Sequence, residues 1–195
     1  MAENQPIRTL RVAIVTEDKP DREYIGNWIQ RCGAYSSEQV GIELYPSLFV
    51  QANLPPVNHR EERLTEIHKI LRDHTDWDIA VNPASYSAGD ALAYISLLPL
   101  PVTLAYIDDT YRRYIVVKPG DCKVFLHEFF HAFILSNLHS DSGLMSSSGV
   151  ALLPFTPLVN VTEYLSPQDR EEVLKNKWRD FNNRVEVEGP DRLSE

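Results

Sequence analysis

Two histidines and a glutamate in the second half of the chain have the spacing of a zinc site. His127 and His131 are four residues apart, and Glu128 directly follows the first of them. Residues at positions i and i+4 of a helix project from the same face, one turn apart, so both imidazoles can bind one zinc ion. Glu128 can then take a proton from a water bound to that ion, which is the general-base role in metal-assisted hydrolysis. The spacing predicts a helix that carries a hydrolytic zinc site.

The surroundings of this motif predict that its helix is buried. Apolar residues precede it at 124–126, interrupt it at 129–130 and follow it at 133–135. A helix that is apolar nearly all round is typical of a protein interior. Short motifs of this kind also arise by chance on helices that bind no metal. We adopt the zinc interpretation, because burying two imidazoles and a carboxylate without partners would cost several kcal/mol.

The residues after the motif resemble those of the metzincin zinc peptidases. That family has the pattern HExxHxxGxxH, followed by a turn that contains a methionine beneath the zinc. This chain has Ile134 at the position of the glycine and Asn137 at the position of the third histidine. A histidine, His139, comes two residues later, and the sequence Gly143-Leu144-Met145 supplies the methionine turn. The resemblance covers about residues 116–145, with a weaker similarity near residues 164–181.

This resemblance implies a set of roles for the site. His127, His131 and His139 are the expected ligands of one zinc ion, with a fourth position left for water and substrate. Glu128 is the expected catalytic base. Met145 is expected to form a hydrophobic floor beneath the ion without binding it.

The altered spacing leaves the third ligand open. Without a glycine at Ile134, we expect the helix to continue toward Ser136 or Asn137, because asparagine can adopt the left-handed turn that ends helices. The chain would then reverse about two residues later, which matches the delay of His139. Asp141 and Glu163 are the alternative third ligands.

Composition excludes several other classes of function. The chain has 195 residues, 43% of them hydrophobic and 24% charged, and a formal net charge of −9. These values are typical of a globular protein and argue against nucleic acid as a partner, since a phosphate backbone attracts a basic surface. No apolar run approaches the roughly 20 residues that span a bilayer, and no signal peptide is recognisable, so we expect no membrane partner and a cytoplasmic location.

The remaining reactive side chains are expected to be peripheral. Cys32 and Cys122 are far apart in sequence and are expected to be free thiols, with Cys122 as a candidate metal or redox residue. Three further histidines lack mutual i, i+4 spacing, so we expect them on the solvent side of their helix: His59, His68 and His74.

Hydrophobic periodicity predicts alternating strands and helices. The expected strands are Leu10–Val15, Gly41–Tyr45 continued at Leu48–Val50, Trp77–Val81, Val102–Ile107 and Tyr114–Val117. The expected helices are Asp21–Arg31 closing at Gly33, His59–His74, the metal helix capped by Asp121, and a last helix capped by Ser166 with Val173, Leu174, Trp178 and Phe181 on its apolar face.

Together these features predict a single α/β (α+β) domain over residues 1–195, built on a twisted mixed sheet with backing helices. The active-site helix would end an upper lobe of about residues 8–139, and a small lower lobe of about residues 140–185 would end in a helix. The predicted function is a zinc-dependent metallopeptidase that acts on a peptide or protein. The alternatives are a catalytically inactive zinc-containing domain that binds peptides or proteins, and a zinc hydrolase with Asp141 or Glu163 as the third ligand. Oligomeric state and cleavage specificity are not predicted.

Overall fold

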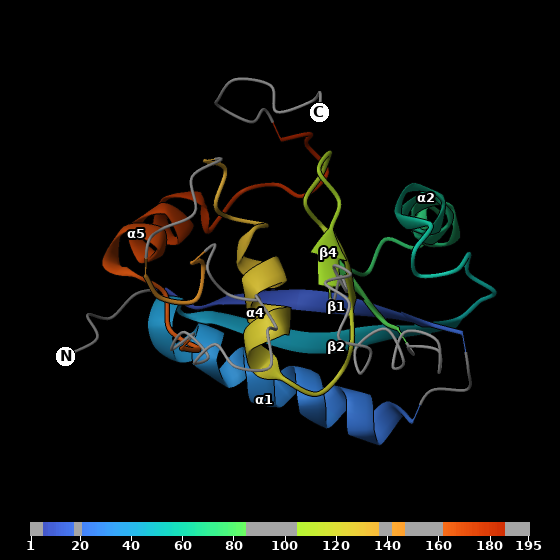
Figure 1. Cartoon of the computed structure of the whole chain (residues 1–195), viewed down its shortest axis with the longest axis horizontal. Helices are drawn as coiled ribbons and strands as arrows, with labels where there is room; N and C mark the ends of the chain where they lie inside the picture. Colours follow the sequence, from blue (N-terminus) through green and yellow to red (C-terminus); the bar gives the residue numbers. More distant parts are fainter. Residues whose placement is uncertain (1–5, 18–20, 85–104, 137–141, 147–161, 186–195) are drawn as a thin grey trace, which may run out of the picture.

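A five-stranded mixed sheet is the centre of the molecule (Figure 1). The computed structural model describes residues 6–17, 21–84, 105–136, 142–146 and 162–185. The strand order is β2-β1-β3-β5-β4, with β4 antiparallel to β5 and the other neighbours parallel. The strands are β1 (Arg8–Thr16), β2 (Ile42–Gln51), β3 (Ile79–Pro83), β4 (Ala105–Ile107) and β5 (Tyr114–Val117). The predicted α/β class and mixed sheet are therefore confirmed, whereas the lobe boundary stays a prediction.

Four described helices cover the two faces of this sheet. They are α1 (Arg22–Val40), α2 (Arg60–Leu71), α4 (Cys122–Phe130) and α5 (Pro167–Asn176). Alternate side chains of β1 divide the core, because successive residues of a strand point to opposite faces. Val12 and Ile14 pack in one cluster with residues of α1, α4 and α5, while Ala13 packs with α2. Figure 1 shows α1 along one side of β1 and β2, and α2 on the opposite side.

Helix α1 is longer than the sequence predicted. It continues through Gly33 and ends at Gly41, which adopts the left-handed conformation with φ of 66°. A Cβ atom added at Gly33 would lie 3.1 Å from the Cβ of Leu44 in β2. Gly33 therefore allows close contact between helix and strand, and the expectation that it ends the helix was wrong.

Helix α4 ends earlier than expected. Its last regular residue is Phe130, and the chain then makes tight turns through Phe133, so the predicted continuation to Ser136 or Asn137 was wrong. Side chains from other elements bind the carbonyls at this end. Arg179 donates to Ala132, the amide of Asn176 donates to Phe133 over 2.8 Å, and Arg112 donates to Ile134. These donors satisfy backbone carbonyls that a longer helix would have used itself.

Helix α5 begins as predicted and stops earlier. Ser166 accepts a hydrogen bond from the backbone N–H of Asp169, and Pro167 is the first helical residue. Val173 and Phe181 are buried, but the side chain of Trp178 is 60% exposed. Trp178 lies beyond the last helical residue, so the helical spacing that predicted its burial does not apply there.

The two cysteines form a disulfide, so the prediction of free thiols was wrong. Cys32 of α1 and Cys122 at the start of α4 are 90 residues apart in sequence, yet their Cα atoms are 5.1 Å apart. The contact follows from packing of α1 against α4, where the rings of Trp28 and Phe125 have centroids 5.2 Å apart. A disulfided Cys122 has no thiolate to offer a metal.

None of the helices in the described part of the chain has the length and apolar composition needed to cross a bilayer.

Candidate metal centre

The histidine pair lies at the C-terminal end of α4. The helix begins at Cys122 because the carboxylate of Asp121 accepts the backbone N–H of Lys123 over 2.9 Å, as its predicted role requires. His127 is then in the last turn and His131 is the residue that ends the helix. Their imidazole rings are perpendicular, with centroids 4.8 Å apart. The helix therefore directs both rings to one place, as the four-residue spacing predicts.

The distance between the two rings fits a shared metal ion. Nε2 of His127 and Nε2 of His131 are 3.2 Å apart. Two zinc–nitrogen bonds of about 2.0–2.1 Å at a tetrahedral angle would place the nitrogens about 3.3 Å apart. At this distance two ring nitrogens require either a proton or a cation between them. The pair thus has the chemistry and the spacing of two zinc ligands.

A backbone carbonyl orients the first histidine. Nδ1 of His127 lies 2.9 Å from the carbonyl oxygen of Leu144. A carbonyl only accepts, so Nδ1 is the protonated nitrogen and Nε2 carries the lone pair. Hydrogen bonds of this kind fix the tautomer and orientation of metal-binding imidazoles. The carbonyl of Leu144 was missed by sequence reasoning, because a backbone group carries no signal of its own.

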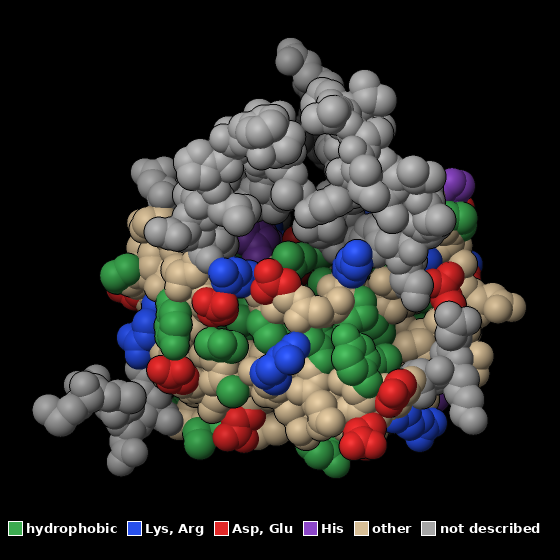
Figure 2. Space-filling model, turned by 60° about the horizontal axis from the view of Figure 1, so that its bottom comes forward, with side chains coloured by type: hydrophobic (Ala, Val, Ile, Leu, Met, Phe, Trp, Pro, Cys, Tyr) green, Lys and Arg blue, Asp and Glu red, His purple; other side chains and the backbone are tan. Residues whose placement is uncertain are grey.

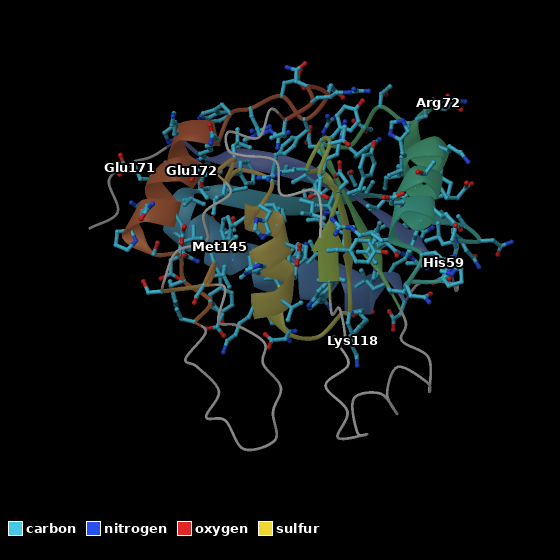
Figure 3. The ribbon with its side chains drawn as sticks, turned by 45° about the horizontal axis from the view of Figure 1, so that its top comes forward. His59, Arg72, Lys118, Met145, Glu171 and Glu172 are labelled. Atoms are coloured by element: carbon cyan, nitrogen blue, oxygen red, sulfur yellow. A yellow bond between two sulfur atoms is a disulfide. The ribbon has the colours of Figure 1, made fainter. Side chains whose placement is uncertain are left out.

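The turn that supplies this carbonyl depends on a glycine. Gly143 has φ of +79°, and a Cβ atom at this position would lie 2.8 Å from the backbone nitrogen of Ser166. The backbone N–H of Leu144 donates to the carbonyl of Tyr164 over 2.8 Å. Met145, which follows, is buried and lies beside α4 on the side toward α5 (Figure 3). The predicted methionine turn therefore packs against both the metal helix and the segment before α5.

Glu128 is in an environment that disfavours its charge. Burial raises the pKa of its carboxyl group to about 7, while the charge of Arg60 lowers that pKa and the charge of Asp109 raises it. Arg60 and Asp109 form an ion pair with a separation of 3.0 Å. The carboxyl group is thus close to a balance between protonated and ionised forms near neutral pH in the absence of a metal.

The candidate third ligands are not brought to the histidine pair within the described residues. His139 and Asp141 lie outside those residues. Glu163 lies inside them, and its carboxylate is 3.8 Å from the ammonium group of Lys123. No group of three metal-binding side chains occurs in the part of the chain that the structure describes. Within the described residues the predicted site consists of His127, Glu128 and His131.

A second carboxylate holds the chain where it leaves the metal helix. Glu172 accepts the backbone N–H groups of Leu135 and Ser136 over 2.7 and 2.8 Å, and the hydroxyl of Ser136 over 2.7 Å. Glu172 lies on the side of α5 toward α4, and Glu171 on the opposite side (Figure 3). Sequence reasoning missed this contact too, because helical spacing alone does not say what a charged side chain binds.

Elsewhere the surface has mixed character. The expectation that His59, His68 and His74 lie on the solvent side is confirmed, since all three are exposed. Figure 2 views the molecule from the side on which α1 lies, where acidic, basic and hydrophobic side chains are interspersed.

Comparisons with known proteins support the fold. No family model matches this sequence, and no curated protein matches it either. Among solved structures, an archaemetzincin from Methanopyrus kandleri matches with a TM-score of 0.54 and 16% identity, covering 88% of this chain and 97% of that one. A zinc-dependent peptidase from Methanocorpusculum labreanum matches with a TM-score of 0.46 and 11% identity, covering 83% of this chain and 99% of that one.

The chain therefore has a metzincin-like α/β fold, as the resemblance of its motif to that family implied.

Proposed function

We propose that this protein is a zinc-dependent metallopeptidase, with one zinc ion held by His127, His131 and His139 and with Glu128 as the general base. The observation that carries the proposal is the 3.2 Å separation of the two Nε2 atoms, with His127 oriented by the carbonyl of Leu144. The similarity of the fold to that of an archaemetzincin supports it, because the motif of this chain resembles that of the metzincin zinc peptidases.

In this mechanism the zinc ion, Glu128 and His127 would each have a separate role. A bound zinc ion would supply a Lewis acid that polarises the substrate carbonyl and lowers the pKa of a water molecule. Glu128 would remove the proton from the attacking water and deliver it to the nitrogen of the departing amine. Nδ1 of His127 would keep its proton and donate it in a hydrogen bond to the carbonyl of Leu144, so that Nε2 stays available as a ligand.

Peptide hydrolysis tests this proposal. A set of unstructured peptides should be cleaved by the zinc-loaded protein, cleavage should stop with a chelator, and added zinc should restore it. Glu128→Gln should keep the zinc and lower turnover by about two to four powers of ten, the usual contribution of a positioned proton-transfer group. Glu171→Gln, at an exposed position of α5, serves as the control. Equal rates in Glu128→Gln and the parent would refute the role of Glu128, and zinc binding without hydrolysis would favour a domain that only binds peptides.

His139 is proposed as the third ligand because neutral imidazole is a preferred ligand of zinc. His139→Ala should lose zinc, while Asp141→Ala and Glu163→Ala should retain it. Zinc content per chain after gel filtration measures the difference. Full retention in His139→Ala with loss in Asp141→Ala or Glu163→Ala would reassign the ligand.

Substrate and location remain parts of the proposal. A peptide or protein substrate follows from the proposed activity. The cytoplasmic location rests on the sequence, and the disulfide counts against it, because persistent disulfides are typical of oxidising compartments. Fractionation of cells that make the protein distinguishes a cytoplasmic location from an oxidising compartment.

A further inference from the structure

Gln39 is a buried polar residue near the end of α1, far in sequence from the metal helix. Its side-chain amide spans a short segment before α5. Nε2 donates to the carbonyl of Glu163 over 3.0 Å, and Oε1 accepts the backbone N–H of Leu165 over 2.7 Å. Nε2 also donates to the carbonyl of Tyr35 within its own helix over 3.0 Å. The carbonyls only accept and the N–H only donates, so these partners fix the orientation of the amide.

Tyr164, which lies between the two residues that Gln39 binds, connects Gln39 to His127 through hydrogen bonds. Tyr164 lies between Glu163 and Leu165, and its carbonyl accepts the backbone N–H of Leu144 over 2.8 Å. The carbonyl of Leu144 in turn accepts Nδ1–H of His127 over 2.9 Å. A continuous path of hydrogen bonds and peptide units thus runs from Gln39 to the first predicted zinc ligand.

We propose that Gln39 is a positioning residue for His127. By holding both neighbours of Tyr164, Gln39 fixes the direction of the Tyr164 carbonyl, and that carbonyl fixes the turn whose own carbonyl orients the imidazole. The relevance of this path to zinc binding rests on the proposed function, whereas its effect on His127 does not.

Three features connect Gln39 with this role. An amide of this length can donate to one backbone group and accept from another, whereas a glutamate at the same position could only accept. Helix α5, which follows Tyr164, is also joined to the backbone of Gln39, because Nε of Arg170 donates to the Gln39 carbonyl over 2.8 Å. Gly143 allows the methionine turn to lie close to the segment before α5, since a Cβ atom added at Gly143 would lie 2.8 Å from the backbone nitrogen of Ser166. A shift of that segment would therefore also move the turn.

Zinc affinity of two variants tests the inference. Gln39→Met keeps the length and removes the hydrogen bonds, and it should weaken zinc binding by about 10–100-fold, the usual effect of losing a group that orients a ligand. Gln39→Glu keeps the acceptor for Leu165 but turns a second acceptor toward the carbonyls of Glu163 and Tyr35, so it should also weaken zinc binding. Affinity is measured by competition with a chromophoric chelator at a temperature where every variant is folded.

A control separates positioning from general loss of stability. Ile67→Val removes one methylene from the core on the opposite face of the sheet, where Ile67 is buried against residues of β1 and β3. It should lower the melting temperature without changing zinc affinity. Equal zinc affinity in Gln39→Met and Ile67→Val would overturn the inference.

The tautomer of His127 gives a readout that needs no metal. Two-bond proton–nitrogen NMR spectra of the metal-free protein should show His127 protonated mainly at Nδ1 in the parent. Gln39→Met should raise the fraction protonated at Nε2, and Ile67→Val should not. If the parent binds no zinc but this shift occurs, the positioning of His127 holds and the peptidase proposal fails. An unchanged tautomer in both Gln39 variants overturns the inference, and Gln39→Glu provides the comparison if Gln39→Met does not fold.

Discussion

The buried environment of Glu128 changes the acidity of its carboxyl group. Burial raises the pKa of its carboxyl group from 4.5 to about 7, so the folded metal-free protein binds this proton more tightly than the unfolded chain does. A raised pKa of an acid means that the ionised form is destabilised by folding. The stability contributed by Glu128 is therefore highest below pH 4.5 and is lost as the pH rises toward 7.

Glu128→Gln should thus stabilise the metal-free protein at neutral pH and above. The gain over the parent should be near zero below pH 4.5 and grow to at most about 3 kcal/mol above pH 7, since each pKa unit corresponds to about 1.4 kcal/mol. Urea unfolding at a series of pH values, with chelator present, measures it. A constant difference between variant and parent across this range would contradict the origin assigned to the shift.

Gly143 is the residue on which the methionine turn depends. Gly143→Ala would put a Cβ atom 2.8 Å from the nitrogen of Ser166 at a φ of +79°, which only glycine adopts without strain. The expected loss is about 1–3 kcal/mol of unfolding free energy, together with weaker zinc binding because the carbonyl of Leu144 moves.

Gly26→Ala is the matched control for that substitution. Gly26 lies within α1, and a Cβ atom there would meet nothing within 4 Å. Alanine is about 0.5–1 kcal/mol more favourable than glycine inside a helix, so this variant should be more stable than the parent. If both alanine variants were equally stable, Gly143 would not have the role assigned here.

At the scale of elements, the end of α4 is set by side chains from other parts of the chain. Glu172 of α5 accepts two backbone N–H groups and a hydroxyl just beyond the helix. Glu172→Ala should cost about 1.5–3 kcal/mol, the usual value for hydrogen bonds to a charged group. Glu171→Ala, on the exposed side of the same helix, should change stability by less than about 0.5 kcal/mol. Denaturant unfolding of both variants measures the difference, and similar losses would show that Glu172 does not hold this segment.

The disulfide is the second link between elements that converge on the metal helix. It joins α1 to the first residue of α4 across 90 residues of sequence. Replacing Cys32 and Cys122 together by serine should lower the unfolding free energy by about 2–4 kcal/mol, chiefly by loosening the constraint on the unfolded chain. Dithiothreitol should cause a similar loss in the parent and no loss in the double variant. An effect of the reductant on the double variant would point to another cause.

The sequence predicted elements better than it predicted where they end. The strands around Ile14, Val81 and Val116 follow from apolar runs, which local propensity is sufficient to define. The end of α4 depends on Arg112 and Arg179, which are distant in sequence, so local spacing could not reveal it. The same holds for the cysteine pair, which only the packing of α1 against α4 brings together.

At the scale of the whole molecule, the helix that carries the candidate site packs on one face of the sheet together with α1 and α5. Residues of α1, α4 and α5 share one core cluster with β1, while α2 covers the other face. The spacing of His127, Glu128 and His131 was readable from the sequence because it lies within one helix. Leu144, which orients His127, and Gln39, which we propose holds the segment behind it, could not be identified from the sequence. Only the fold brings these residues, distant in sequence, together.

Zinc content per chain tests the central claim most directly. Purified parent protein, stripped with chelator, reloaded with zinc and passed through a desalting column, is analysed beside the variants His127→Ala, His131→Ala and Glu128→Gln. The account predicts one zinc ion per chain in the parent and in Glu128→Gln, and little zinc in either histidine variant, with circular dichroism showing that all four are folded. Zinc bound equally well by a folded His127→Ala, or no zinc bound by the parent, would contradict it.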